Sequence, residues 1–431
     1  MTMPAGAQPS WFGQPRGLTV LFLTNMWEQF SYYGMRAILV YYMTKELLFS
    51  QERSSLIYGA YTATAYFTPI VGGLIADRYL GKRRAIVIGG SIMAAGHFMM
   101  TFEPLFFPAL ATIALGNGLF LPSLPSQIDD LYEPGDPRVG WAYNVYYVGV
   151  NVGGFLAPLI CGALGEAYGW HWGFGAAGIG MCAGLGFYLW GQRYLPAAVR
   201  HPRVERGTPP RGRFDRRTIT LLVGIFAAVA VFRGAYEQIG NTVALWADTG
   251  VDKQVGARAI PMSWFISLNP LFVMAMTPFL LAWWRRRAEA GRPEAPARRM
   301  ATGALIVGAS FLLLAVLAAT HGDRPTAWPW FVLFFAVLTL GELFILPTGL
   351  GLFARAAPAG MGATTVAAWY LATFAGSLFA GVVGTLWSSM DHAVFFTLLA
   401  VIAAAAAAGL RGCDALEQQV RHTRNSGAQS A

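Results

Sequence analysis

Charged side chains are scarce in this sequence of 431 residues. Asp, Glu, Lys and Arg make up 12% of the chain, whereas 55% of its residues are hydrophobic and the mean hydropathy is +0.46. Soluble domains carry about 25% charged residues, so a chain this apolar lacks the polar surface that water requires. The composition therefore excludes a soluble enzyme and a nucleic-acid-binding protein, and it predicts a membrane protein.

Cysteine is also scarce, and the sequence motifs of common enzymes are missing. Cys161, Cys182 and Cys413 lie far apart, without histidines at metal-ligand spacing. This pattern excludes a disulfide framework, a zinc site and a redox pair. No His/Cys cluster, nucleophile elbow, phosphate-binding loop or carboxylate dyad is legible in the sequence. We therefore expect a protein that is not an enzyme and that has no metal and no cofactor.

Long apolar runs are abundant instead. About 18 apolar residues are needed to cross about 30 Å of hydrocarbon, and this threshold selects twelve runs. They are residues 18–44, 54–76, 85–102, 106–128, 140–165, 170–192, 218–246, 261–284, 300–320, 327–354, 361–387 and 393–410. The first run follows a polar leader and is too long for a signal sequence, so we expect it to be retained. The predicted fold class is an all-α membrane protein with twelve transmembrane helices.

The positions of Lys and Arg predict the orientation. If the N-terminus is cytoplasmic, 24 of the 31 basic residues fall in cytoplasmic segments, five fall outside and two, Arg36 and Arg233, fall within spans. Cytoplasmic loops are enriched in Lys and Arg, so both termini are predicted to be cytoplasmic. The excess of arginine over lysine and the abundant alanine are typical of GC-rich bacteria. These features favour an integral protein of a bacterial inner (plasma) membrane.

The longest polar connection separates the sixth and seventh spans. Residues 193–217 contain four prolines and eight arginines, which is typical of a linker. The predicted organisation is therefore an N-terminal six-helix bundle at residues 1–192, a cytoplasmic linker at 193–217 and a C-terminal six-helix bundle at 218–431. The linker arginines are interpreted as positive-inside anchors, with binding of anionic lipid as the alternative.

The two halves resemble each other at corresponding places. Trp27-Glu28-Gln29 matches Tyr236-Glu237-Gln238, and Leu121-Pro122-Ser123 matches Leu346-Pro347-Thr348, a register that pairs Asn117 with Glu342. The fifth and eleventh spans match at Gly140/Gly362, Tyr147/Trp369 and Gly154/Gly376. Matches in the same order indicate duplication, which is typical of transporters built from parallel repeats.

Five strongly ionisable side chains fall well inside the expected spans: Glu28, Arg36, Arg233, Glu237 and Glu342. Each costs at least ~2.5 kcal/mol to bury in a membrane, so each is expected to have a partner or to face a cavity. Arg233 and Glu237 are four residues apart and share one helix face, as do Glu28, Tyr32 and Arg36 in two steps. Structural ion pairs between helices are one interpretation. The other is a polar cavity with charges of both signs, which suits a zwitterion.

A loop motif after the second span identifies a superfamily. Gly72-Gly73-Leu74-Ile75-Ala76-Asp77-Arg78-Tyr79-Leu80-Gly81-Lys82-Arg83-Arg84 resembles the loop motif of the major facilitator superfamily. That resemblance implies the major facilitator fold, with Gly73, Asp77 and Arg78 as a conformational latch.

Further motifs point to one family within it. Glu28-Gln29-Phe30-Ser31-Tyr32-Tyr33-Gly34-Met35-Arg36 resembles the signature Glu-x-x-Glu-Arg-Phe-x-Tyr-Tyr-Gly of the proton-coupled oligopeptide transporter family. The resemblance continues at Tyr147-Val148-Gly149-Val150-Asn151-Val152-Gly153, Glu237-Gln238, Ser267-Leu268-Asn269-Pro270, Gly341-Glu342-Leu343 and Trp369. It therefore covers nearly the whole chain.

The resemblance implies a proton-coupled transporter of di- and tripeptides or similar solutes that works by alternating access. Arg36 would bind the peptide carboxylate, and Glu342 would bind the ammonium group. Asn151 and Asn269 would bind the peptide backbone, and the walls of the side-chain pockets would come from Tyr32, Tyr33, Tyr66, Tyr147 and Trp369. Proton coupling would fall to Glu237, with Glu28 and Arg233 as further candidates. The implied partners are the peptide, protons and the bilayer, and the protein is expected to be a monomer that binds no nucleic acid.

The sequence also departs from this family. Asn25 replaces the first glutamate of the signature, Gln29 replaces its arginine, and Leu121 replaces a lysine common in the fourth span. Arg233 is a candidate substitute for that lysine as the partner of Glu237. Two other functions stay open from the sequence: a major facilitator exporter of drugs or metabolites, and a membrane receptor without transport activity.

Overall fold

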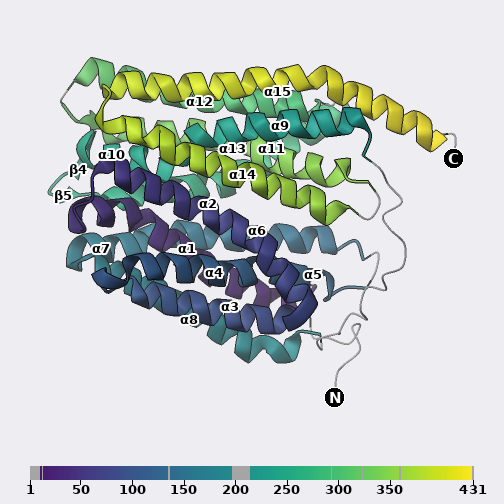
Figure 1. The fold of residues 1–431 in the computed structure, drawn as a ribbon, viewed down its shortest axis with the longest axis horizontal. Helices are drawn as coiled ribbons and strands as arrows, with labels where there is room; N and C mark the ends of the chain where they lie inside the picture. Colours follow the sequence, from purple (N-terminus) through teal and green to yellow (C-terminus); the bar gives the residue numbers. More distant parts are fainter. Residues whose placement is uncertain are drawn as a thin grey trace. The chain divides into compact units, whose positions relative to one another are not determined.

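The computed structural model describes residues 10–11, 13–133, 136–196, 214–292, 294–322, 324–358 and 361–429. Over these residues the chain is almost entirely helical (Figure 1). Most of the expected linker, residues 197–213, lies outside the described residues.

The helices follow the apolar runs of the sequence. Those of the N-terminal part are α1 (Arg16–Tyr41), α2 (Gln51–Ile75), α3 (Lys82–Met99), α4 (Phe106–Ser123), α5 (Ser126–Asp129), α6 (Val139–Ala157), α7 (Ala163–Tyr168) and α8 (Trp170–Gly191). Those of the C-terminal part are α9 (Arg216–Tyr236), α10 (Thr242–Thr249), α11 (Leu268–Glu289), α12 (Pro296–His321), α13 (Trp328–Ala356), α14 (Gly362–Gly384) and α15 (His392–Gln429). The strands have two residues each: β1 (Ser10–Trp11), β2 (Gln14–Pro15), β3 (Val251–Asp252), β4 (Gln254–Val255), β5 (Arg258–Ala259) and β6 (Thr326–Ala327).

Nine helical segments of the described chain are long and apolar enough to cross a membrane, and all lie between Glu103 and Gln419. They coincide with the fourth to twelfth expected spans. The first three expected spans form α1, α2 and α3, which are less apolar. In α1 the polar side chains of Asn25, Glu28 and Arg36 lower the hydropathy. The prediction of a helical membrane protein is confirmed at this level.

The chain divides into two compact units. Unit 1 contains residues 1–49, 64–205 and 256–271, and unit 2 contains residues 50–63, 206–255 and 272–431. Each unit therefore includes one short segment from the part of the sequence that otherwise forms the other unit.

In unit 1, α1 packs against α6 and α8, and α3 packs against α4 and α8. Glycines permit the closest approaches. A Cβ on Gly116 of α4 would lie 2.6 Å from the carbonyl oxygen of Gly89 on α3, so both positions require the smallest residue. The amide of Asn117 donates a hydrogen bond of 2.9 Å to the carbonyl oxygen of Ala65 on α2. Pro69 has no N–H to bond that carbonyl, so Asn117 replaces the bond that the proline removes from the helix.

Unit 2 repeats this arrangement. Helix α9 packs against α14 and α15, and α12 packs against α13 and α15 (Figure 1). A Cβ on Gly341 of α13 would lie 2.6 Å from the carbonyl oxygen of Gly303 on α12. Gly341 precedes Glu342 as Gly116 precedes Asn117, so the same close approach recurs one repeat later. This shared packing agrees with the duplication predicted from sequence.

The segment Gly256–Leu271 belongs to unit 1 because of contacts to the end of its fifth span. The carboxylate of Glu166 in α7 accepts hydrogen bonds from the backbone N–H groups of Met262 and Ser263, each at 3.0 Å, and from the Ser263 hydroxyl at 2.5 Å. These N–H groups begin the 3-10 segment that leads into α11, so Glu166 caps a helix start. Gly162 provides the room, because its Cβ would lie 2.0 Å from the Ser263 hydroxyl.

The segment Ser50–Ala63, which includes the first part of α2, belongs to unit 2. The side chain of Gln51 donates a hydrogen bond of 2.8 Å to the carbonyl oxygen of Gly384 at the end of α14. One turn later, the Ser55 hydroxyl donates to the side chain of Asn241 at 3.1 Å. Gly59 then meets Gly381 backbone to backbone, at a would-be Cβ distance of 2.5 Å.

Candidate functional site

The centre of unit 2 contains a buried ion pair. Arg233 near the end of α9 and Glu237, one turn later, form a salt bridge, and their side chains are only 5% and 1% exposed. The pairing predicted from their spacing is therefore confirmed. Arg233 fits against α14 only because residue 376 is glycine, since a Cβ on Gly376 would lie 2.4 Å from Cβ of Arg233.

Tyr236 connects this ion pair to a further carboxylate. The guanidinium of Arg233 lies over the Tyr236 ring, 5.5 Å from its centroid. The Tyr236 phenol in turn interacts with the carboxylate of Glu342 on α13. Glu342 is buried, with 8% of its surface exposed. One cation and two carboxylates therefore gather around one phenol within unit 2.

Trp369 lies on α14 in the same unit and is 6% exposed. Its ring covers Gly349 of α13, where a Cβ would lie 2.2 Å from the indole. The ring also packs edge to face on Phe353, with centroids 5.5 Å apart. Gly349 is seven residues, or two helical turns, after Glu342, so Trp369 packs on the same helix as Glu342 at a different level.

In unit 1, the carboxylate of Glu28 on α1 has an uncharged hydrogen-bond partner. Glu28 is 1% exposed and accepts a hydrogen bond of 2.7 Å from the side-chain amide of Gln29. Gln29 stands where the family signature has an arginine. The amide of Asn25, one turn earlier, donates to the carbonyl oxygen of Tyr146 on α6 at 3.0 Å. At both departures from the signature, an uncharged amide side chain therefore donates a hydrogen bond.

The other sequence-predicted residues of unit 1 lie on α1, α2, α6 and the start of α11. Tyr32 and Tyr33 are half-buried neighbours whose rings meet edge to face at 5.4 Å. Tyr33 packs on Gly154 of α6, where a Cβ would lie 3.2 Å from the Tyr33 ring and 3.7 Å from Pro270. Arg36 and Tyr66 are half-buried.

The same part of α6 positions both expected asparagines. The amide of Asn151 donates to the carbonyl oxygen of Tyr147 at 2.9 Å, and Asn151 lies one turn before Gly154. The Ser267 hydroxyl donates to the carbonyl oxygen of Phe155 at 2.8 Å. Asn269 follows two residues later, so α6 and the start of α11 are joined where the two asparagines occur.

The structure places the latch residues in different environments. Asp77 and Arg78 are exposed. Gly73 has only an ordinary contact, since its Cβ would lie 3.5 Å from Pro122, whereas a Cβ on Gly72 would lie 2.1 Å from the carbonyl oxygen of Gly118. Further along the loop, Lys82 forms a salt bridge of 2.7 Å with Asp130. The closest contact of this motif with α4 is therefore at Gly72, and Lys82 binds the segment that follows α4.

Gln238 is a buried residue that the sequence analysis assigned no role. Its side-chain amide donates to the carbonyl oxygens of Gly234 and Ala380, and its side-chain oxygen accepts from Asn241 and Thr242. It thereby joins α9, α14 and α10. Its place beside Glu237 in the repeated motif was the available sequence signal.

Comparisons with known proteins agree with these features. The family model described as the POT family matches residues 83–204 and 212–401 of the chain. The uncharacterized transporter YclF of Bacillus subtilis is 31% identical, over 92% of this chain and 92% of that protein. A di-/tripeptide transporter of Lactococcus lactis subsp. cremoris is 28% identical, over 92% of this chain and 94% of that protein.

Solved structures show the same similarity. The crystal structure of peptide transporter POT in complex with sulfate matches with a TM-score of 0.88 and 28% sequence identity, over 96% of this chain and 98% of that chain. The family model covers more than half of this sequence, and the similarity extends over nearly all of each relative. The chain therefore belongs to the POT family and is a membrane transporter.

Proposed function

We propose that this protein is a proton-coupled transporter of di- and tripeptides or closely similar solutes, working by alternating access. Its twelve spans form two six-helix bundles, residues 1–192 and 218–431, joined by the linker 193–217. It acts as a monomer in a bacterial inner membrane, with both termini in the cytoplasm. The family match and the printed activity of the Lactococcus relative support this function.

The observation that carries the proposal is the presence of charges of both signs at protected positions in helices of both units. Arg36 in unit 1 is half-buried, and Glu342 in unit 2 is 8% exposed. A short peptide presents a carboxylate at one end and an ammonium group at the other. A binding site for it requires a cation, an anion and amide partners, since buried charges must be compensated.

In this proposal Arg36 binds the peptide carboxylate and Glu342 binds the ammonium group. Asn151 and Asn269 supply amide groups for the peptide backbone. The aromatic side chains of Tyr32, Tyr33, Tyr66, Tyr147 and Trp369 form walls that tolerate different peptide side chains. The indole of Trp369 packs against α13, the helix that carries Glu342, and therefore forms a wall of fixed position.

The proton-coupling carboxylate is Glu237, paired with Arg233, and Glu28 is the second candidate. Leu121 stands where the family resemblance implies a lysine partner for Glu237, and Arg233 supplies a cation one turn away instead. Protonation of Glu237 breaks the ion pair, and this change of charge permits the reorientation step. The loop residues Gly73, Asp77 and Arg78 act as the latch between conformations.

The test is uptake into liposomes that contain the purified protein. With an acidic exterior and a neutral interior, labelled dialanine should accumulate above its external concentration, and an uncoupler should abolish the accumulation. A panel of unlabelled di- and tripeptides should compete, whereas single amino acids should compete weakly. If no peptide accumulates while an unrelated drug or metabolite is moved, the peptide assignment is wrong and an exporter of the same fold is the better conclusion. If no solute is transported, the result favours the alternative of a membrane receptor without transport activity.

A further inference from the structure

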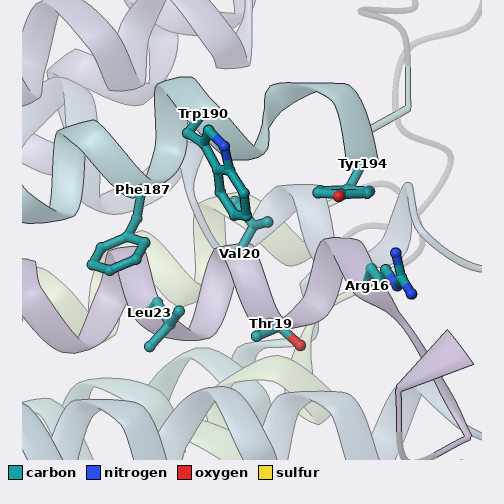
Figure 2. A pocket seen from close by; sticks show the side chains of 7 residues that line it. All are labelled: Arg16, Thr19, Val20, Leu23, Phe187, Trp190 and Tyr194. Carbon is teal, nitrogen blue, oxygen red and sulfur yellow. The ribbon is translucent and has the colours of Figure 1, made fainter. Parts of the chain in front are cut away.

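A groove lies between α1 and α8, and none of the residues that line it has a role in the proposed transport function. It encloses about 270 Å³ and is lined on one side by Arg16, Val20 and Leu23, and on the other by Phe187, Trp190 and Tyr194. Figure 2 shows the gradient along it: Arg16 and Tyr194 lie at one end, Phe187 and Leu23 lie at the other, and the indole of Trp190 reaches over Val20 between them. All of these residues belong to unit 1.

Two arginines concentrate positive charge at the polar end. The guanidinium of Arg16 lies 5.9 Å from the centroid of the Tyr194 ring. The guanidinium of Arg193 lies 4.7 Å from the centroid of Trp190 and 4.8 Å from that of Tyr194. Both arginines are exposed. Among the described residues, no carboxylate forms a salt bridge with either of them, so the aromatic rings orient both cations while their charge stays available.

The backbone around this end is fixed and adds positive potential. Arg83 of α3 donates a hydrogen bond of 2.8 Å to the carbonyl oxygen of Leu195, which anchors the segment that carries Arg193 and Tyr194. Helix α1 begins at Arg16, so the unpaired N–H groups and the dipole of its first turn also favour an anion there. The Thr19 hydroxyl adds a polar group to the lining.

The other end of the groove is apolar and opens outward. Trp190 is 62% exposed, Phe187 is 37% exposed, and a Cβ on Gly186 would meet nothing within 4 Å. Arg16 and Leu23 are seven residues apart, which places about 10 Å of helix between the polar and apolar ends. At the end of a membrane span, arginine, tryptophan and tyrosine typically lie at the depth of the lipid headgroups. An apolar surface one to two helical turns further into the membrane lies at the depth of the acyl chains.

We propose that this groove binds an anionic phospholipid, with its phosphate between Arg16 and Arg193 and one acyl chain along Val20, Leu23, Phe187 and Trp190. A zwitterionic lipid places an ammonium group beside the same two cations and binds less well. A free phosphate has no group for the apolar part of the groove. The site does not depend on peptide transport, because it uses none of the residues assigned to the substrate or to protons.

Native mass spectrometry of the full chain in mild detergent tests the proposal. Phosphatidylglycerol and phosphatidylethanolamine with the same acyl chains are titrated in parallel, and glycerol phosphate serves as the headgroup without chains. We expect one saturable phosphatidylglycerol per chain, weaker phosphatidylethanolamine binding and no binding of glycerol phosphate. Arg16→Gln and Arg193→Gln should each weaken phosphatidylglycerol about fivefold, and the double variant should weaken it about 25-fold.

The matched control is Arg411→Gln, an exposed arginine near the end of the last span and outside the groove. It should leave the saturable site unchanged. Trp190→Ala should weaken the long-chain lipid more than a short-chain phosphatidylglycerol. Equal affinity for both headgroups, equal losses in Arg16→Gln and Arg411→Gln, or comparable binding of glycerol phosphate would each overturn the proposal. Because all these readouts are lipid binding, they are independent of any failure to transport peptides.

Discussion

Replacing Glu237 by glutamine should destabilise the protein more than replacing Arg233 by alanine. Both side chains are almost completely buried, at 1% and 5% exposure. Glu237→Gln leaves a guanidinium that cannot lose its proton, in a place closed to water. Arg233→Ala leaves a carboxylate, a group whose charge, unlike that of a guanidinium, protonation can remove. The two substitutions break the same ion pair but leave different residual charges.

The magnitude follows from what remains around Arg233. Breaking a buried ion pair from one side costs about 3–5 kcal/mol. The Tyr236 ring stays 5.5 Å from the guanidinium, and the Tyr236 phenol interacts with the carboxylate of Glu342, so the lower end of this range applies. A kilocalorie shifts the melting temperature by about 2 °C or less in a chain this long. We therefore expect a decrease of about 4–6 °C for Glu237→Gln, about half of that for Arg233→Ala, and near recovery in the double variant.

Thermal unfolding in detergent is the assay, and the chain provides its own control. Arg285 and Glu289 have the same spacing, but their side chains are 82% and 60% exposed. Exposed pairs are worth at most about 1 kcal/mol, so Glu289→Gln should shift the melting temperature by less than 2 °C. Equal shifts for Glu237→Gln and Glu289→Gln would refute the reasoning about burial.

Transport by the same variants separates coupling from structure. If Glu237 carries the proton, Glu237→Gln should abolish accumulation driven by a pH gradient and should spare counterflow, which needs no net proton movement. The double variant should then also fail to accumulate peptide. If the double variant still concentrates peptide, Glu237 has a structural role and the coupling role passes to Glu28.

The remaining predictions concern the substrate and the helix contacts. Glu342→Gln should weaken the binding of zwitterionic dipeptides about tenfold and that of N-acetylated dipeptides little, because a charge-assisted hydrogen bond to the ammonium group is lost. Arg36→Ala should weaken peptides with a free C-terminus about tenfold and C-amidated peptides little. Competition assays measure both effects, and equal losses for blocked and free peptides would remove the assignments. Gly72→Ala should destabilise the protein by about 1–3 kcal/mol because of the contact with Gly118, whereas Gly73→Ala should be tolerated, and melting temperatures decide between them. Glu166→Gln should cost about 1 kcal/mol as a lost helix cap, and hydrogen exchange at Met262 and Ser263 should accelerate; unchanged exchange would contradict the capping role.

Periodicity and spacing predicted the parts of this protein that depend on local sequence. The apolar runs located the helices because crossing hydrocarbon requires a fixed length, and nine of the expected spans recur as apolar helical segments. The Arg233–Glu237 pair followed from helix geometry alone. The repeat was detectable because matching motifs, such as Trp27-Glu28-Gln29 and Tyr236-Glu237-Gln238, occur in the same order in both halves. The structure adds a close contact of glycines that recurs at Gly116 and Gly341.

Contacts between distant segments were not predictable. Nothing in the sequence around Glu166 indicates that its carboxylate caps the start of a helix almost a hundred residues later. Gly72 and Gly73 are the same residue type in sequence, and only the structure shows that a Cβ would clash with α4 at Gly72 and make an ordinary contact at Gly73. The neutral partner of Glu28 was equally hidden, because Gln29 is adjacent in sequence and adjacent helical residues usually diverge.

Helices α2 and α11 each belong to two compact units, and this has a mechanical consequence. Residues of α2 up to Ala63 cluster with unit 2 and those from Thr64 with unit 1, while α11 changes from unit 1 to unit 2 after Leu271. The backbone of each helix therefore continues from one compact unit into the other. Each contains a proline a few residues past the change, Pro69 and Pro278, which removes one backbone hydrogen bond and lowers bending stiffness. Both helices are therefore expected to bend more easily near these positions than a helix without an internal proline would.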